Sequence, residues 1–287
     1  MKPVLTKIVV ACGSVVLSCG IFFFLRCDES IVSGLVPDED VLHAFDLKYP
    51  DADDIVWTLE KNYYVADFSR KAMRVQAWFD MQGDWSQSRE EMDGEQLHRL
   101  VANAFSAGKY AARPVESVSL LERKDLAAIY LIHLSGDENV NLYYSAFGDL
   151  IKVRYHVTEY MEMPVLVSPE ISAGIDRLFD NAVMVDLWIN SYGIQACIRD
   201  NGQYKIIAFD DDYEWLASIW EIDERSVPEV ILNGFKASKY GRMAVDRYRI
   251  LVNYDSVSYL IYFREGDTDK IMKLTDTGTP LYVISFD

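Results

Sequence analysis

The chain repeats itself at an offset of 130 residues. Trp85 recurs as Trp215 and Phe79 recurs as Phe209, with no gap between the matched positions. The same register also relates Lys109 to Lys239, Tyr110 to Tyr240 and Gly148 to Gly278. One register held over this length is not chance, and a repeat constrains the fold more than any local pattern does. The sequence therefore predicts two copies of one domain, residues 37–157 and 167–287.

Each copy changes its hydrophobic period from helical to alternating twice. In the first half of copy one, Val41, Leu42, Phe45 and Tyr49 follow helical spacing, and strands follow at Ile55–Glu60, 63–68 and 74–79, with Trp85 opening a fourth. The second half repeats the plan, with a helix at Gly94–Ala107 and strands near 115–122, 127–134, 138–146 and 150–156. We expect an α+β fold of two layers: four tandem units, two in each copy, each a helix plus a four-stranded antiparallel sheet with one open face.

The first 27 residues are an export signal or membrane anchor. Lys2 and Lys7 precede the uncharged stretch Ile8–Leu25, a pattern that directs the following chain across the membrane. Eighteen helical residues would span about 27 Å, close to the thickness of a bilayer core. A short linker, residues 28–36, then leads into the first copy.

Three of the four cysteines lie in or beside that segment. Cys19 ends the sequence Val16-Leu17-Ser18-Cys19, which is similar to a bacterial lipobox, and Cys27 precedes an acidic stretch. Cys19 and Cys27 are therefore candidate lipidation sites. Lipid attachment, a retained transmembrane helix and plain secretion all remain open, and all place the body in the cell envelope, facing the periplasm or at the outer membrane.

Composition narrows the possible partners. The formal net charge is -17, with 28 Lys and Arg against 45 Asp and Glu. Such a field repels phosphate backbones, so nucleic acid is not an expected partner. Half of the residues are hydrophobic, which suits a folded body with a substantial core.

Residues 40–92 carry a family resemblance. The motifs are Tyr49-Pro50-Asp51-Ala52, Tyr63–Phe68 and Ala77–Trp85, in that order. This run resembles the PepSY-like, beta-lactamase-inhibitor-like family of exported Bacteroidota proteins. The resemblance implies tandem helix-plus-four-strand units that share a concave antiparallel sheet, no established enzymatic activity, and a role in binding or inhibiting proteins. In copy two Asp211-Asp212-Tyr213-Glu214 replaces the glycine turn, which leaves that hairpin's geometry open.

The sequence shows no catalytic or metal-binding set, and we expect no cofactor. By the 130-residue offset, the four histidines correspond to non-histidine residues: His43 to Ala173, His98 to Pro228, His133 to Phe263 and His156 to Phe286. Asp210–Asp212 has the wrong spacing for an EF-hand. An Asp at a strand end commonly binds its own turn, so we interpret Asp210 as a turn residue. Cys197 lies in an apolar stretch typical of a structural thiol.

Alternation assigns residues to the two faces of the first sheet. If Tyr64, Ala66, Phe68, Val75, Ala77 and Phe79 lie under the helix, the neighbouring residues point to the open face. The candidate ligand-binding residues are Trp78, Tyr63, Val65, Arg74 and Gln76. We expect a non-enzymatic, membrane-tethered envelope protein that binds a protein or peptide there, with an inhibitory role as one form of that binding. The alternative is a periplasmic enzyme of an unrecognised carboxylate type.

Overall fold

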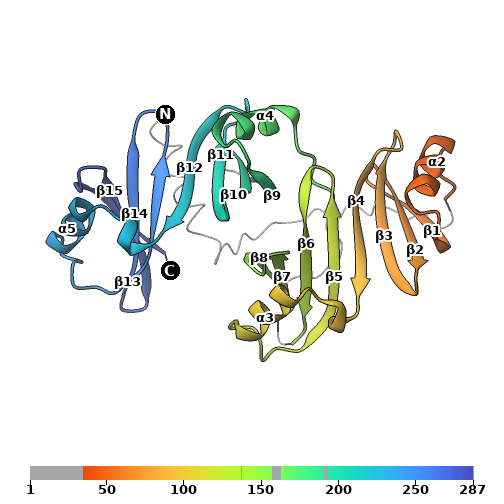
Figure 1. The fold of residues 1–287 in the computed structure, drawn as a ribbon, viewed down its shortest axis with the longest axis horizontal. Coiled ribbons are helices and arrows are strands. Elements are labelled where there is room, and N and C mark those ends of the chain that lie inside the picture. Colours follow the sequence, from red (N-terminus) through yellow and green to blue (C-terminus); the bar gives the residue numbers. More distant parts are fainter. Residues whose placement is uncertain (1–34, 137, 157–162, 191–192, 287) are drawn as a thin grey trace. The chain divides into compact units, whose positions relative to one another are not determined.

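The computed structural model describes residues 35–136, 138–156, 163–190 and 193–286 (Figure 1). These residues form two compact units, and the boundary between them falls between Val167 and Ser168. In the described part of the chain, no helix is long and apolar enough to cross a membrane. The predicted anchor and its cysteines Cys19 and Cys27 lie outside the described residues.

Unit 1 contains helices α2 and α3 and strands β1–β8, while unit 2 contains α4, α5 and β9–β16. The elements of unit 1 are α2 (Glu39–Lys48), β1 (Asp53–Glu60), β2 (Tyr63–Arg70), β3 (Met73–Asp80), β4 (Trp85–Met92), α3 (Arg99–Ala107), β5 (Val115–Arg123), β6 (Leu126–Leu134), β7 (Val140–Ser145) and β8 (Leu150–Tyr155). Those of unit 2 are α4 (Pro169–Leu178), β9 (Val183–Asn190), β10 (Gly193–Asp200), β11 (Gln203–Phe209), β12 (Trp215–Ile222), α5 (Glu229–Ala237), β13 (Val245–Val252), β14 (Val257–Glu265), β15 (Thr268–Thr275) and β16 (Pro280–Phe286).

Each unit has one eight-stranded antiparallel sheet with its strands in sequence order. The α+β fold class predicted from the sequence is confirmed. The two four-stranded halves of a copy join edge to edge, because β4 pairs with β5 in unit 1 and β12 pairs with β13 in unit 2. The helix expected over Gly94–Ala107 is two elements, a 3-10 turn at Gly94–Gln96 and α3. Asp93 caps that turn by accepting the Glu95 amide.

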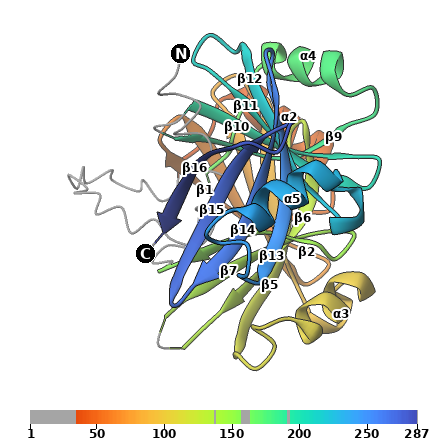
Figure 2. The same cartoon turned by 90° about the vertical axis from the view of Figure 1, so that its left-hand side faces the viewer.

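Both helices of unit 1 cover the same face of the sheet. Val75 on β3 packs in the cluster under α2. Val75 lies opposite Glu90 on β4, Glu90 lies opposite Leu120 on β5, and Leu120 lies opposite Tyr130 on β6. Tyr130 packs in the cluster under α3. Because directly opposed residues lie on one face of a sheet, neither α2 nor α3 lies on the other face, which carries no helix among the residues that the structure describes. In unit 2, Figure 2 shows α5 lying across β13–β15 in the same manner.

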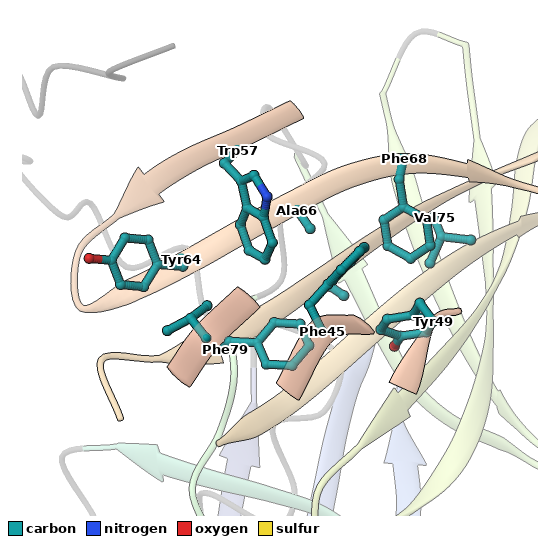
Figure 3. Packing of buried hydrophobic residues seen from close by; sticks show 10 residues of the cluster. Phe45, Tyr49, Trp57, Tyr64, Ala66, Phe68, Val75 and Phe79 are labelled. Atoms are coloured by element: carbon teal, nitrogen blue, oxygen red, sulfur yellow. The ribbon is translucent and has the colours of Figure 1, made fainter. Parts of the chain in front are cut away.

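Phe45 is the centre of the core under α2. Its ring contacts Trp57 and Phe68 edge to face, with centroids 5.1 and 5.0 Å apart (Figure 3). Tyr64, Ala66, Phe68, Val75, Ala77 and Phe79 all belong to this cluster, so the predicted division of the two faces is confirmed. Such aromatic pairs add about 0.5–1.5 kcal/mol beyond their buried area. Trp85 packs at the margin of the cluster, with the Lys48 ammonium 3.8 Å from its ring centroid.

The repeat is preserved in three dimensions with one exception. Tyr130 lies opposite Leu120, and Tyr259 lies opposite Ile250. The partners on β5 and β13 differ by 130 positions, but the residues on β6 and β14 differ by 129. The expectation of an ungapped register is therefore wrong over β14.

A bulge explains this slip. The ladder between β5 and β6 is irregular between Leu121 and Arg123, which adds one residue in copy one. In copy two the stretch of chain between equivalent positions on β14 and β15 is one residue longer than its counterpart in copy one, which restores the offset of 130. The sequence spacing had paired His133 with Phe263. Because of the slip, His133 corresponds to Tyr262 instead.

The hairpin that lacks glycine in copy two keeps its geometry. Asp80 Oδ1 accepts the amides of Gln82 and Asp84, and Asp210 Oδ1 accepts those of Asp212 and Glu214. Gly83 has φ 89°, and Tyr213 adopts the same left-handed region with φ 64°. The aspartate network, not the glycine, is therefore what both turns share. The interpretation of Asp210 as a turn residue is confirmed.

Candidate functional site

The position of Trp57 shows which side chains of β1 lie on the helix-free face of unit 1. This side chain is buried under α2, so its neighbours on β1 point to the opposite face. Val56 lies opposite Asp67, and Thr58 lies opposite Val65. On the next strand Val65 lies opposite Trp78, and Asp67 lies opposite Gln76. The side chains of three adjacent strands therefore meet on one surface.

A hollow of about 390 Å³ lies on this surface, over β1, β2 and β3. Its lining residues are Val56, Thr58, Glu60, Val65, Asp67, Arg74 and Gln76. Val65 is buried, Val56 is 49% exposed, and the other lining residues are half-buried except for the exposed Arg74. Two of the seven lining residues are valines and the other five are polar or charged, so the hollow is more polar than a usual small-molecule pocket.

The polar part of the hollow is organised around Asp67. Arg74 donates to both carboxylate oxygens, through Nε at 3.0 Å and through a terminal nitrogen at 2.5 Å. Gln76 Nε2 donates to the same carboxylate at 3.2 Å. The hydrogen bonds that Arg74 donates to Asp67 raise the pKa of the guanidinium above its usual range. The guanidinium is therefore held in a fixed orientation, although its side chain remains 59% exposed.

Three of the five residues predicted from sequence line the hollow, namely Val65, Arg74 and Gln76. Tyr63 lies at the end of β2 opposite Asp80, outside the lining set. Trp78 is also outside it and is only 1% exposed, which differs from the accessible position that alternation had indicated. Its indole Nε1 is buried with no hydrogen-bond acceptor in the described part of the chain.

Sequence reasoning did not select Val56, Thr58, Glu60 or Asp67. The signal was present, because Trp57 is the apolar position in an alternating strand and its neighbours must face the other side. The prediction followed the second and third strands only. Which residues border a hollow depends on the packing of β1 against β2, and this is not encoded in alternation.

In copy two a tryptophan stands where a residue of the hollow stands in copy one. Trp188 occupies the position of Thr58, and Gln195 occupies that of Val65. The indole Nε1 of Trp188 donates to Gln195 Oε1 at 2.7 Å. The Asp67 position is Cys197, which is buried, and the Arg74 position is Tyr204. The charged network is thus specific to copy one.

The described residues show no group of three or more His, Cys, Asp or Glu side chains able to hold a metal ion. The four histidines are in separate elements or loops. His133 is buried, with Nδ1 2.5 Å from Asn141 Oδ1, whereas His156 is exposed and lies 3.1 Å from a Glu138 oxygen. This arrangement offers no convergent acid–base pair at the hollow.

Comparison with protein families identifies the relatives of this fold. The model of the beta-lactamase-inhibitor-like, PepSY-like family matches residues 62–152 and 192–278, one match in each copy. The chain belongs to this family. The resemblance noted in residues 40–92 is thereby confirmed and extends to both copies. No curated protein matches the chain.

Solved structures of similar proteins come from Bacteroides. A BLIP-like protein of Bacteroides fragilis is 25% identical, covers 46% of this chain and 96% of its own length, and has a TM-score of 0.44. A DUF2874 family protein of Bacteroides ovatus is 29% identical, covers 44% and 93%, and has a TM-score of 0.42. Each of these proteins therefore has about the length of one copy.

Proposed function

We propose that the protein is a non-enzymatic binding protein of the bacterial envelope that holds a protein or peptide on the helix-free face of unit 1. The hollow over β1–β3 is the observation that carries this proposal. Val56 offers apolar contact at the border of the hollow, and Asp67, Arg74 and Gln76 offer oriented hydrogen-bonding groups. A shallow surface of this kind suits side chains of a larger ligand.

Membrane tethering is the second part of the proposal. Lys2, Lys7 and the uncharged stretch that follows them support export of the body, and Cys19 and Cys27 are the candidate acceptors of lipid. Palmitate labelling of cells tests this directly. Label that is lost in Cys19→Ala or in Cys27→Ala identifies the acceptor, whereas absence of label in the wild type contradicts lipidation. Protease added to spheroplasts should cut the body, and protection until lysis contradicts the topology.

The binding proposal is tested by filling the hollow with the residue that copy two already uses. Thr58→Trp places an indole where Trp188 stands in unit 2, on the same strand of an equivalent sheet. The full chain, its Thr58→Trp variant and a control would each be used to capture ligands from envelope extract. Leu47→Trp is the control, because Leu47 is 70% exposed on α2, which covers the opposite face.

A ligand retained by the wild type and by Leu47→Trp but lost by Thr58→Trp supports the proposal. A ligand that Thr58→Trp retains equally well contradicts it. Circular dichroism and thermal melting of the three proteins must agree, so that loss of capture is not loss of fold.

A further inference from the structure

Strand β1 forms one edge of the unit 1 sheet. It pairs with β2 on one side, and the strand order ends there. In an antiparallel sheet an edge strand directs alternate amide and carbonyl groups outward, where they can pair with another extended chain. The hollow borders this same strand, because Val56, Thr58 and Glu60 line it.

The edge lacks two of the usual protections against pairing, proline and cationic side chains. Strand β1 contains no proline, lysine or arginine, and Ile55 and Val56 are 41% and 49% exposed. The last strand of unit 2, β16, instead begins with Pro280. Prolines and cations are common means of blocking an edge, so β1 is the more open of these two strands.

A bulge arranges the charges of β1. Asp53 lies opposite Ser69 and Val56 lies opposite Asp67, so three steps on β1 match two on β2. Asp54 lies in this bulge and adopts a left-handed backbone conformation, with a φ of 55°. The shift brings Asp53 to the same face as Val56, Thr58 and Glu60. On this face, strand β1 therefore has a carboxylate at each end, from Asp53 and Glu60. Between them lie the apolar Val56 and the hydroxyl-bearing Thr58.

We infer that β1 accepts an extended peptide as a ninth strand, with basic residues at both ends of the paired segment. Main-chain hydrogen bonds to β1 would supply affinity, and every second side chain of the peptide would point to the same face as the hollow, beside its β1 border. The charges argue against a second copy of β1 as the occupant. Antiparallel pairing of two β1 strands centred on Val56 and Trp57 would place Asp53 of one copy opposite Glu60 of the other, and like charges directly opposed are destabilising.

This inference rests on the proposed function and specifies its ligand. The probe is a synthetic octapeptide, Lys-Thr-Val-Thr-Val-Thr-Lys-Thr with both ends blocked, whose two lysines share one face because they are six residues apart, and binding to the full chain in mild detergent is followed by fluorescence anisotropy. Two isomers carry N-methyl groups on alternate amides, at even or at odd positions. Only one set of amides faces β1 in a paired strand. One isomer should bind like the parent, and the other should lose at least about tenfold. Equal behaviour of the two isomers overturns strand addition.

The role of charge is tested at Asp53. This residue is exposed, and the bulge places it on the same face as the β1 residues that line the hollow. Asp53→Lys should weaken the lysine-ended peptide about three- to tenfold and strengthen a glutamate-ended counterpart. Asp46→Lys on α2 makes the same change in net charge on the opposite face and should leave both affinities unchanged. Equal effects of the two variants overturn the assignment of β1.

The two proposals fail in different ways. If Thr58→Trp abolishes ligand capture from envelope extract but the octapeptide does not bind, strand addition is wrong and the hollow remains the site. If Thr58→Trp leaves capture unchanged, the hollow itself is not the site.

Discussion

Tyr143 and Lys152 lie directly opposite each other on β7 and β8, with the Lys152 ammonium 4.9 Å from the Tyr143 ring centroid. In unit 2 the equivalent positions hold Lys273 and Tyr282, so the two residue types have exchanged strands. The ammonium there is 5.8 Å from the ring centroid. The lysine–tyrosine pair is therefore present in both copies, with the cation supplied by β8 in unit 1 and by β15 in unit 2.

Lys273 should be destabilising at neutral pH. Its side chain is buried beside Leu260, and desolvation lowers the pKa of its amine. The unfolded chain therefore binds this proton more tightly, and stability rises as pH increases through the window between the lowered pKa and the usual value. We expect Lys273→Met to raise stability at pH 7 by about 0.5–2 kcal/mol, the range usual for stabilising changes. Urea unfolding at several pH values should show this gain shrinking toward pH 10.5, and a gain independent of pH would contradict the assignment.

Tyr49 should make the protein sensitive to alkali. Burial raises the pKa of the Tyr49 hydroxyl to about 12. The unfolded residue ionises near pH 10. The contribution of the Tyr49 hydroxyl to the free energy of unfolding is therefore complete below pH 10 and is lost as pH rises toward 12. The loss corresponds to about 2–3 kcal/mol. In denaturant unfolding from pH 9 to 12, Tyr49→Phe should lose less stability than the wild type. Tyr254→Phe, at a tyrosine that is 70% exposed, should follow the wild type.

Gly148 should tolerate no side chain. Its φ is 88°, and an added Cβ would lie 2.6 Å from the carbonyl oxygen of Leu100 on α3. Gly148→Ala thus combines backbone strain with overlap against a helix, and we expect a loss of about 3 kcal/mol or more. Gly266 has φ 62° and nothing within 4 Å of such an atom, so Gly266→Ala should lose only about 1 kcal/mol. Thermal melting distinguishes the two, and equal losses would show that strain alone decides.

Trp78 should be needed for stability through its volume and not through its indole nitrogen. The side chain is 1% exposed, and its Nε1 has no acceptor among the residues described. Trp78→Ala should cost about 3–5 kcal/mol, and Trp78→Phe should cost much less because the ring remains and no hydrogen bond is lost. Calorimetry of both variants checks this. A phenylalanine variant as unstable as the alanine variant would reveal a partner for the nitrogen.

The sequence by itself determined the duplication, the order of helices and strands, and the division of the first sheet into two faces. These follow from periodic patterns, and burial requires such patterns wherever one face of a strand packs against a helix. Phe68 and Phe79 were placed under α2 correctly for this reason. The residues of the hollow on β2 and β3 were accessible to the same reasoning, and Val65, Arg74 and Gln76 were found by it.

Only the tertiary structure decided the burial of Trp78, the one-residue slip over β14 and the left-handed turn at Tyr213. It also placed Val56 and Thr58 of the edge strand against β2 to complete the hollow. Alternation states which way a side chain points but not how much of it its neighbours cover. A bulge of one residue leaves almost no trace in composition, although it shifts the register of a whole strand and decides which residues meet.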